Sequence, residues 1–190
     1  KNNHKGPKWD FKFLRHLNEY NSWIKNLHVM DQGDTLSVKY FHFYHTHFPV
    51  DFDSIGTIRS NNIDWFNDNQ NYNGLYNQTY YALTQFVNLI KKLKELNIYD
   101  NTFIIFKSDH GENGEYFNNY PETATFNGND RWGYSRYRPT LLIKDFSSIS
   151  SSIMTESNLV SLGDLPNTIN VRFKKYYGHE NTYSGLNLLE

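Results

Sequence analysis

The sequence predicts an α/β fold with a mostly parallel sheet flanked by helices. The segment Thr-Phe-Ile-Ile-Phe at 102–106 is apolar, with β-branched and aromatic residues and no polar alternation, which indicates a strand covered on both faces. A long amphipathic helix precedes this strand, and further apolar segments lie at 36–44 and 140–143. The 190 residues are enough for one substantial core. We therefore expect a single domain over residues 1–190.

The N-terminal elements follow from local patterns. Residues 10–27 place apolar side chains at helical intervals after Asp10, which predicts an amphipathic helix capped by that residue. Leu36 to Tyr44 is typical of a strand, and it ends at the segment His45-Thr46-His47-Phe48-Pro49. Residues 51–73 are dense in Asn, Asp, Ser and Gly without a sustained period, which indicates a loop or a short helix.

The second half of the chain is organised around one long helix. An apolar stripe at alternating steps of three and four residues predicts a helix from Leu75 to about Asn97, which leads into the strand at 102–106. The polar and aromatic stretch 111–134 is long for a connection in a compact domain, and such loops often carry function. Residues 140–143 predict a third strand, and residues 159–171 a final helix that is interrupted or started at Pro166.

Composition excludes several classes of function. The net charge is −1 and the pI is about 6.8, so no basic field is present that would hold nucleic acid. The absence of Cys excludes disulfides, a Cys-based zinc site and a cysteine nucleophile within this chain. No window approaches the roughly 18 apolar residues of a membrane span. We therefore expect a soluble chain without a membrane span and without a nucleic-acid partner.

The segment Ser108-Asp109-His110-Gly111-Glu112 is the strongest candidate for a functional site. Ligands bind outside the carboxyl ends of parallel strands, and here a buried strand ends in a carboxylate and an imidazole. These two groups could form half of a divalent-metal site. The alternative is an ordinary turn, because Asp and Gly are favoured in turns for local reasons.

Six segments together resemble the alkaline phosphatase superfamily in its sulfatase-like branch. They are a histidine-proline segment after a strand, a long helix, the entry Tyr99 to Thr102, the strand end Ser108 to Glu112, the strand Tyr137 to Ile143, and the helix Val160 to Ile169. Their order matches that of the family over most of the chain. The resemblance implies an alkaline-phosphatase-like fold, partial in this chain, and an enzyme that acts on sulfate or phosphate esters at a divalent-metal centre.

The resemblance also implies roles for individual residues. Asp109 and His110 would be metal ligands, and His47 would bind the oxyanion of the substrate or the leaving oxygen, assisted by His45. Mixed nitrogen and oxygen ligands favour Zn²⁺ or Mn²⁺, with Ca²⁺ and Mg²⁺ as alternatives. Such a metal polarises a phosphoryl or sulfuryl oxygen and stabilises the charge on the equatorial oxygens. The implied function is that of a sulfatase-like hydrolase or a phosphoethanolamine- or phosphoglycerol-transferase-like enzyme, acting on cell-envelope glycans or lipids.

The chain departs from the family in its N-terminal part. Relatives carry an acidic metal ligand on a first strand and a nucleophile at a following helix start, both well before the histidine-proline segment, whereas here about forty residues precede it and predict one helix. The Cys-x-Pro-x-Arg signature is absent as well. We expect a C-terminal portion of the catalytic domain, inactive by itself, with a degenerate relative as the alternative. The parent could be membrane-anchored and associated with a bacterial cell envelope; the sequence leaves its compartment unknown.

Other interpretations stay open. A catalytically inactive sulfatase-like domain that binds an anionic carbohydrate or a partner protein is the alternative function, and a metal-free α/β scaffold is a third. Glu112 could orient His110 or face solvent in a turn. Several residues of the long loop and the C-terminal region could grip an anion, flank a pocket or have no role in a site: Arg131, Trp132, Tyr134, Arg136, Arg138 and His179.

Overall fold

The computed structural model describes residues 12–29, 36–43, 46–59, 61–111, 134–149, 152–177 and 183–189. These residues form two compact units. The first unit holds the described residues up to 29 and from 40 to 144, and the second holds those from 36 to 39 and from 145 onward. The single domain over residues 1–190 stays a prediction.

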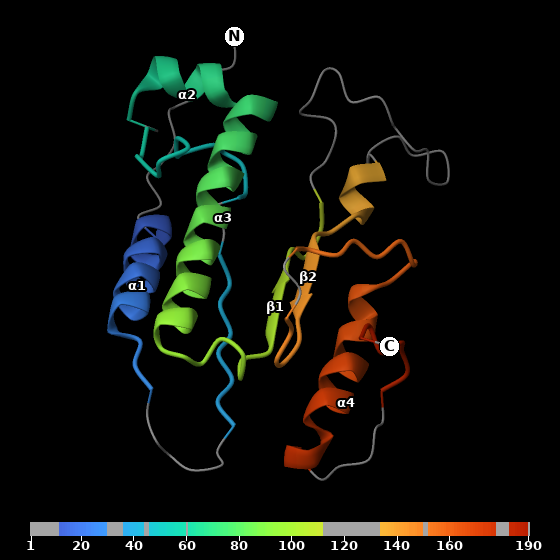
Figure 1. Ribbon diagram of the computed structural model, residues 1–190. Helices are drawn as coiled ribbons and strands as arrows, with labels where there is room; N and C mark the ends of the chain where they lie inside the picture. Colours follow the sequence, from blue (N-terminus) through green and yellow to red (C-terminus); the bar gives the residue numbers. More distant parts are fainter. Residues whose placement is uncertain are drawn as a thin grey trace. The chain divides into compact units, whose positions relative to one another are not determined.

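The first unit contains most of the regular structure. Its helices are α1 (Lys12–Asn26), α2 (Ile63–Asn69) and α3 (Tyr72–Glu95), and its strands are β1 (Ile104–Lys107) and β2 (Leu141–Lys144) (Figure 1). A short 3-10 helix, η2 (Tyr134–Tyr137), precedes β2. Helices α1 and α3 lie side by side (Figure 1). The hydroxyl of Tyr20 donates a hydrogen bond to the backbone oxygen of Gln85 at 3.2 Å.

Helix α3 confirms the long helix that the sequence predicts. It begins where the side chain of Asn71 accepts a hydrogen bond from the backbone N–H of Gly74 at 3.1 Å, as an N-cap residue does. A β-carbon at Gly74 would lie 1.8 Å from the backbone oxygen of Asn69, so only glycine permits this close approach. Tyr81, Ala82 and Leu93 are among its buried residues. Of the apolar stripe in the sequence, Ala82 and Leu93 are buried, whereas Leu75, Phe86, Leu89 and Leu96 are half-buried.

The small core of the first unit joins distant parts of the chain. A buried cluster consists of Leu17 of α1, Tyr81 of α3 and Phe52, which lies between these helices in the sequence. Ile58 packs against this cluster. The rings of Phe52 and Tyr81 stack with their centroids 6.0 Å apart. Phe52 and Ile58 also form an isolated antiparallel bridge, so the segment that follows His47 is anchored in this core.

The prediction of a strand over residues 36–44 is wrong for the residues that the structure describes. The structure assigns no strand to the described residues 36–43. The rings of Phe41 and Phe43 pack on Tyr20 of α1, with centroids 5.8 and 4.8 Å away. The aromatic residues that suggested a strand therefore pack against a helix.

The sheet also differs from the mostly parallel one that the sequence predicts. Among the described residues, the sheet consists of β1 and β2, which pair antiparallel with Ile105 opposite Ile143 and Lys107 opposite Leu141. Phe106 of β1 packs against Phe86 of α3, with ring centroids 4.6 Å apart. Ile104, Ile105 and Phe106 are half-buried and Lys107 is exposed, so the apolar run indicates a strand but neither its full burial nor the direction of the neighbouring strand. The α/β content is confirmed; the parallel arrangement is not found in the described part of the chain.

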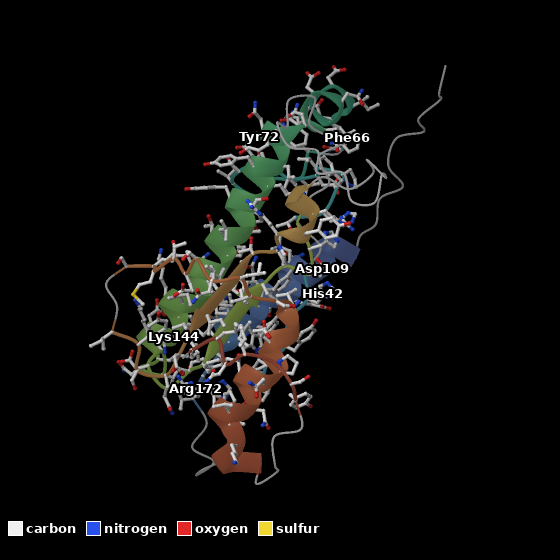
Figure 2. The ribbon with its side chains drawn as sticks, turned by 90° about the vertical axis from the view of Figure 1, so that its right-hand side faces the viewer. His42, Phe66, Tyr72, Asp109, Lys144 and Arg172 are labelled. Atoms are coloured by element: carbon white, nitrogen blue, oxygen red, sulfur yellow. The ribbon has the colours of Figure 1, made fainter. Side chains whose placement is uncertain are left out.

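The connection from α3 into β1 is fixed by Lys144 of β2, which Figure 2 labels. Its ammonium group donates hydrogen bonds to the backbone oxygens of Tyr99, Asp100 and Thr102, and it lies 4.4 Å from the centroid of the Tyr99 ring. The hydroxyl of Thr102 donates to the backbone oxygen of Ile98 at 2.7 Å. This network holds the segment that leads into β1.

The second unit contains the 3-10 helix η3 (Leu162–Asp164) and helix α4 (Leu165–Tyr177). Ser161 and Asp164 form a capping box at the start, which confirms a final helix and places Pro166 in its first turn. Arg172, labelled in Figure 2, forms an ion pair with Asp145 at 2.6 Å. In the part of the chain that the structure describes, no helix combines the length and the apolar composition needed to cross a membrane.

Candidate metal and substrate site

The strand end that carries Asp109 and His110 is held by backbone hydrogen bonds. Beyond β1, the N–H of Ser108 donates to the backbone oxygen of Thr140 at 3.0 Å, and the hydroxyl of Ser108 accepts from the N–H of Thr140 at 2.8 Å. The N–H of Gly111 then donates to the backbone oxygen of Arg136 at 3.0 Å. Asp109, which Figure 2 labels, and His110 are therefore presented on a short turn that is fixed on both sides.

The ring of His110 is oriented by its own backbone. Its Nδ1 lies 2.8 Å from the backbone oxygen of Gly111. A carbonyl oxygen only accepts, so this contact requires the proton on Nδ1 and leaves the lone pair of the neutral ring on Nε2. A histidine that binds a metal commonly donates its other ring N–H in this way. Nε2 is thus the atom of His110 that is available as a ligand.

Asp109 and His110 bring one oxygen and one nitrogen together. The Nε2 atom of His110 lies 3.6 Å from Oδ2 of Asp109, while Oδ1 of Asp109 accepts the N–H of His110 at 3.0 Å. Two ligand atoms at the usual bond lengths from one tetrahedral Zn²⁺ ion are about 3.4 Å apart. The pair therefore fits two adjacent positions of one coordination sphere. Within the described residues, no group of three or more His, Cys, Asp or Glu side chains could hold a metal ion.

The electrostatics of Asp109 favour the charged carboxylate. Burial by itself raises the pKa of this carboxyl group, but the positive charge of protonated His110, hydrogen bonds from backbone N–H groups and the charge of Lys107 outweigh it, so the pKa is lowered. The Asp109 side chain is 71% exposed and that of His110 33%. An anionic oxygen ligand is thus ready at neutral pH and accessible to solvent.

His47 lies on a separate segment of the first unit, just before Val50 and Phe52. Its side chain is exposed, and its Nδ1 is engaged with the backbone oxygen of Phe48, which leaves Nε2 as the nitrogen that can reach a ligand. Among the described residues, no hydrogen bond or ion pair joins His47 to Asp109 or His110. A site shared by all three residues therefore stays a prediction.

The other predicted candidates have mixed outcomes. His45, Glu112, Arg131, Trp132 and His179 lie outside the described residues, as does the side chain of Tyr134. The backbone of Arg136 holds the turn at Gly111 in place, a contact that the sequence did not suggest.

Sequence reasoning overlooked Gln78. This glutamine is 1% exposed and hydrogen-bonds to the backbone of His47, Asp51 and Phe52. A signal was present in the sequence, because Gln78 lies between Leu75 and Ala82 at helical spacing, where a polar residue interrupts an apolar stripe.

The family model described as Sulfatase matches residues 17–169, a range that includes His47, Asp109 and His110. No curated protein and no solved structure matches the chain.

Proposed function

This chain belongs to the sulfatase family of the alkaline phosphatase superfamily, and on that premise we propose that it supplies part of a metal-dependent site for the hydrolysis or transfer of sulfate or phosphate esters. The observation that supports this proposal most directly is the pairing of Asp109 Oδ2 with His110 Nε2 at 3.6 Å beyond the end of β1. A carboxylate that is ionised at neutral pH, and an imidazole oriented by the contact of its Nδ1 with the backbone oxygen of Gly111, have the properties of metal ligands.

In this proposal Asp109 and His110 hold one divalent ion, with Zn²⁺ or Mn²⁺ best suited to their mixed oxygen and nitrogen atoms. When bound, such an ion polarises an oxygen of the ester group and offsets the charge that develops on it. Asp109 contributes a negative charge and His110 a neutral donor, so the pair neutralises half of the charge of the ion. A net positive charge remains to attract an anionic ester.

His47 contacts the substrate in this proposal. When protonated, its Nε2 donates a hydrogen bond to an oxygen of the sulfate or phosphate group, or gives a proton to the oxygen of the departing alcohol. Its exposed position suits contact with an incoming ligand. His45, two residues earlier, would assist. None of these residues acts as a nucleophile, so the proposal concerns the metal-binding and substrate-binding part of the reaction.

The substrates we propose are sulfate or phosphate esters of cell-envelope glycans or lipids. The residues assigned here bind tetrahedral oxyanions of both kinds, because metal ions and imidazolium groups recognise their oxygens and charge. The choice between sulfate and phosphate therefore depends on groups other than Asp109, His110 and His47.

Metal binding by the whole chain tests the proposal. Calorimetric titration with Zn²⁺ and with Mn²⁺ should show saturable binding by the wild-type chain. Asp109→Ala and His110→Ala should each weaken it by more than about 100-fold, since the loss of even an outer-shell partner costs about 10- to 100-fold. The matched control is Asp100→Ala, an exposed aspartate just before β1.

Two results would contradict the proposal. The first is a full-length protein that folds but binds neither ion, which would favour the catalytically inactive domain. The second is binding that survives in both Asp109→Ala and His110→Ala, which would place the ligands elsewhere. In the full-length enzyme, Asp109→Ala should abolish metal-dependent turnover of aryl sulfate or phosphate esters while the protein remains folded.

A further inference from the structure

The segment from His47 to Phe52 has backbone N–H and C=O groups that need hydrogen-bond partners from outside a helix or a sheet. Val50 is 0% exposed and Phe52 is 2% exposed, yet the structure assigns no helix or paired strand to residues 47–51. Buried backbone N–H and C=O groups must still be paired, since an unpaired group costs about as much as a lost hydrogen bond. Two glutamine side chains provide several of these partners.

Gln78 of α3 provides three of the hydrogen bonds. Its Oε1 accepts from the N–H of Asp51 at 2.8 Å and from the N–H of Phe52 at 3.2 Å. Its Nε2 donates to the backbone oxygen of His47 at 3.1 Å. The amide therefore acts as a short strand would, accepting at one end of the segment and donating at the other.

Gln70, at the C-terminal end of α2, pairs with the middle of the same segment. Its Oε1 accepts from the N–H of Val50 at 2.9 Å, and its Nε2 donates to the backbone oxygen of Val50 at 2.9 Å. The same Nε2 donates to the backbone oxygen of Phe66, a residue that Figure 2 labels on α2, at 3.0 Å. The segment is thus fixed to two helices at successive points.

We propose that Gln78 is a positioning residue for His47, an inference that rests on the substrate-binding role proposed for that histidine. The bond from Nε2 of Gln78 fixes the peptide group that directly follows the Cα atom of His47. The next carbonyl, that of Phe48, contacts Nδ1 of the His47 ring. The buried amide of Gln78 therefore fixes the backbone, and the backbone in turn orients the exposed ring of His47.

The chemistry of the site requires glutamine rather than another residue of similar size. Two N–H groups and one C=O face the side chain, so it must accept and donate at once, and a primary amide does both. Methionine has a similar length but provides neither function. An ionised glutamate keeps the acceptor for Asp51 and Phe52 but places a second oxygen opposite the carbonyl of His47.

The test compares Gln78→Met with Gln85→Met in the full chain. Gln85 is a second buried glutamine of α3, 8% exposed, and its side chain makes no hydrogen bond to the described part of the His47 segment, which makes it a matched control for the loss of a buried amide. NMR of 15N-labelled histidine would report the tautomer of His47, and couplings to its β-protons would report the side-chain rotamer. Gln78→Glu is the second variant if Gln78→Met does not fold.

We expect wild type and Gln85→Met to hold one rotamer of His47 with the proton on Nδ1. Gln78→Met should average over rotamers and tautomers while the dispersion of the other signals shows a folded protein. A merely structural role would lower stability without changing the His47 signals of the folded state. Unchanged His47 signals in a folded Gln78 variant would overturn the positioning role.

A second measurement keeps the failure of this inference distinct from that of the proposed function. Inorganic phosphate, added to the full chain, should shift the His47 signals saturably in wild type and with about fivefold lower affinity in Gln78→Met, the factor that one ordinary hydrogen bond is worth. An averaged ring in Gln78→Met with equal phosphate affinity would overturn the claim that the orientation serves binding. A further outcome is that phosphate leaves the His47 signals of wild type unchanged while Gln78→Met still averages the orientation of the ring. That result would contradict the substrate-binding role of His47 and support the positioning role of Gln78.

Discussion

The His47 segment and the Asp109–His110 turn both present exposed polar side chains, but they are held in different ways. The His47 segment is held by side chains. Its backbone forms hydrogen bonds with the side chains of Gln70 and Gln78, and it leads into the buried Phe52. The Asp109–His110 turn depends mainly on backbone hydrogen bonds, from Ser108 to Thr140 and from Gly111 to Arg136, with the hydroxyl of Ser108 as a further acceptor.

This difference separates stability from function in the two regions. Changes beneath the His47 segment should alter both the fold and the placement of the histidine, because the same buried groups serve both. Changes to the exposed carboxylate of Asp109 should leave the fold intact, because its backbone partners remain. The following substitutions test this contrast, in order of decreasing effect on stability.

Phe52→Ala should have the largest effect. Phe52 is 2% exposed and packs against Leu17 and Tyr81, so its truncation should lower the free energy of unfolding by about 3–5 kcal/mol. Urea unfolding followed by circular dichroism measures the loss. Ile55→Ala, at a side chain 77% exposed, should change stability by less than about 0.5 kcal/mol. Equal effects of the two substitutions would mean that the segment is not anchored in the core.

Tyr20→Phe should have an intermediate effect that depends on alkaline pH. The loss of the hydrogen bond to Gln85 should cost about 1 kcal/mol at neutral pH. Burial raises the pKa of Tyr20 to about 12, above its ordinary value of 10. The contribution of the neutral hydroxyl is therefore complete below pH 10 and is lost as the pH rises from 10 to about 12.

The measurement is the difference in urea midpoint between wild type and Tyr20→Phe at several pH values. Since the raised pKa of Tyr81 acts in both proteins, it cancels in this difference. We expect the advantage of wild type to shrink between pH 10 and 12. A constant difference across this range would contradict a buried hydroxyl between α1 and α3.

Asp53→Asn should have a smaller effect that depends on acidic pH. Burial alone raises the pKa of Asp53, but hydrogen bonds from the N–H groups of Thr57 and Ile55 and from Arg59 outweigh it and lower the pKa. A depressed pKa contributes stability above the ordinary value of about 3.9, and this contribution is lost as the pH falls through the folded-state pKa.

Because the carboxylate is near the surface, we expect a loss of less than about 1 kcal/mol for Asp53→Asn at pH 7. The difference from wild type should disappear in acid. Urea unfolding between pH 7 and pH 2 checks this. A difference that grows as the pH falls would show that folding does not lower the pKa of Asp53. The result would show whether the turn after Phe52 supports the His47 segment through charge.

Asp109→Ala should have the smallest effect on stability. Its side chain is 71% exposed, so the change in the free energy of unfolding should stay below about 0.5 kcal/mol. The same urea series without added metal provides the measurement. A loss as large as that from Tyr20→Phe would indicate a structural carboxylate and remove the contrast between the two regions.

Local pattern predicted α3, the strand before Asp109 and a final helix at Pro166 correctly, because helical periodicity and apolar runs depend on residues that are close in the chain. The pairing of Asp109 with His110 belongs to the same class, since the two are neighbours in the chain. The antiparallel direction of β1 and β2 was not predictable from the apolar run. Neither was the packing of Phe41 and Phe43 on α1, since aromatic residues suit a strand and a helix contact alike.

The sequence by itself determined the family and the residue types of the candidate site. Tertiary structure alone decided which groups satisfy the backbone around His47, because Gln78 is 31 residues away and only the packing of α3 brings its amide to that carbonyl. It also decided that the N–H of Gly111 meets the carbonyl of Arg136, a residue distant in the sequence. The physical reason is the same in both cases: residue type and periodicity determine which groups are buried or polar, whereas the identity of a hydrogen-bond partner depends on contacts between distant segments.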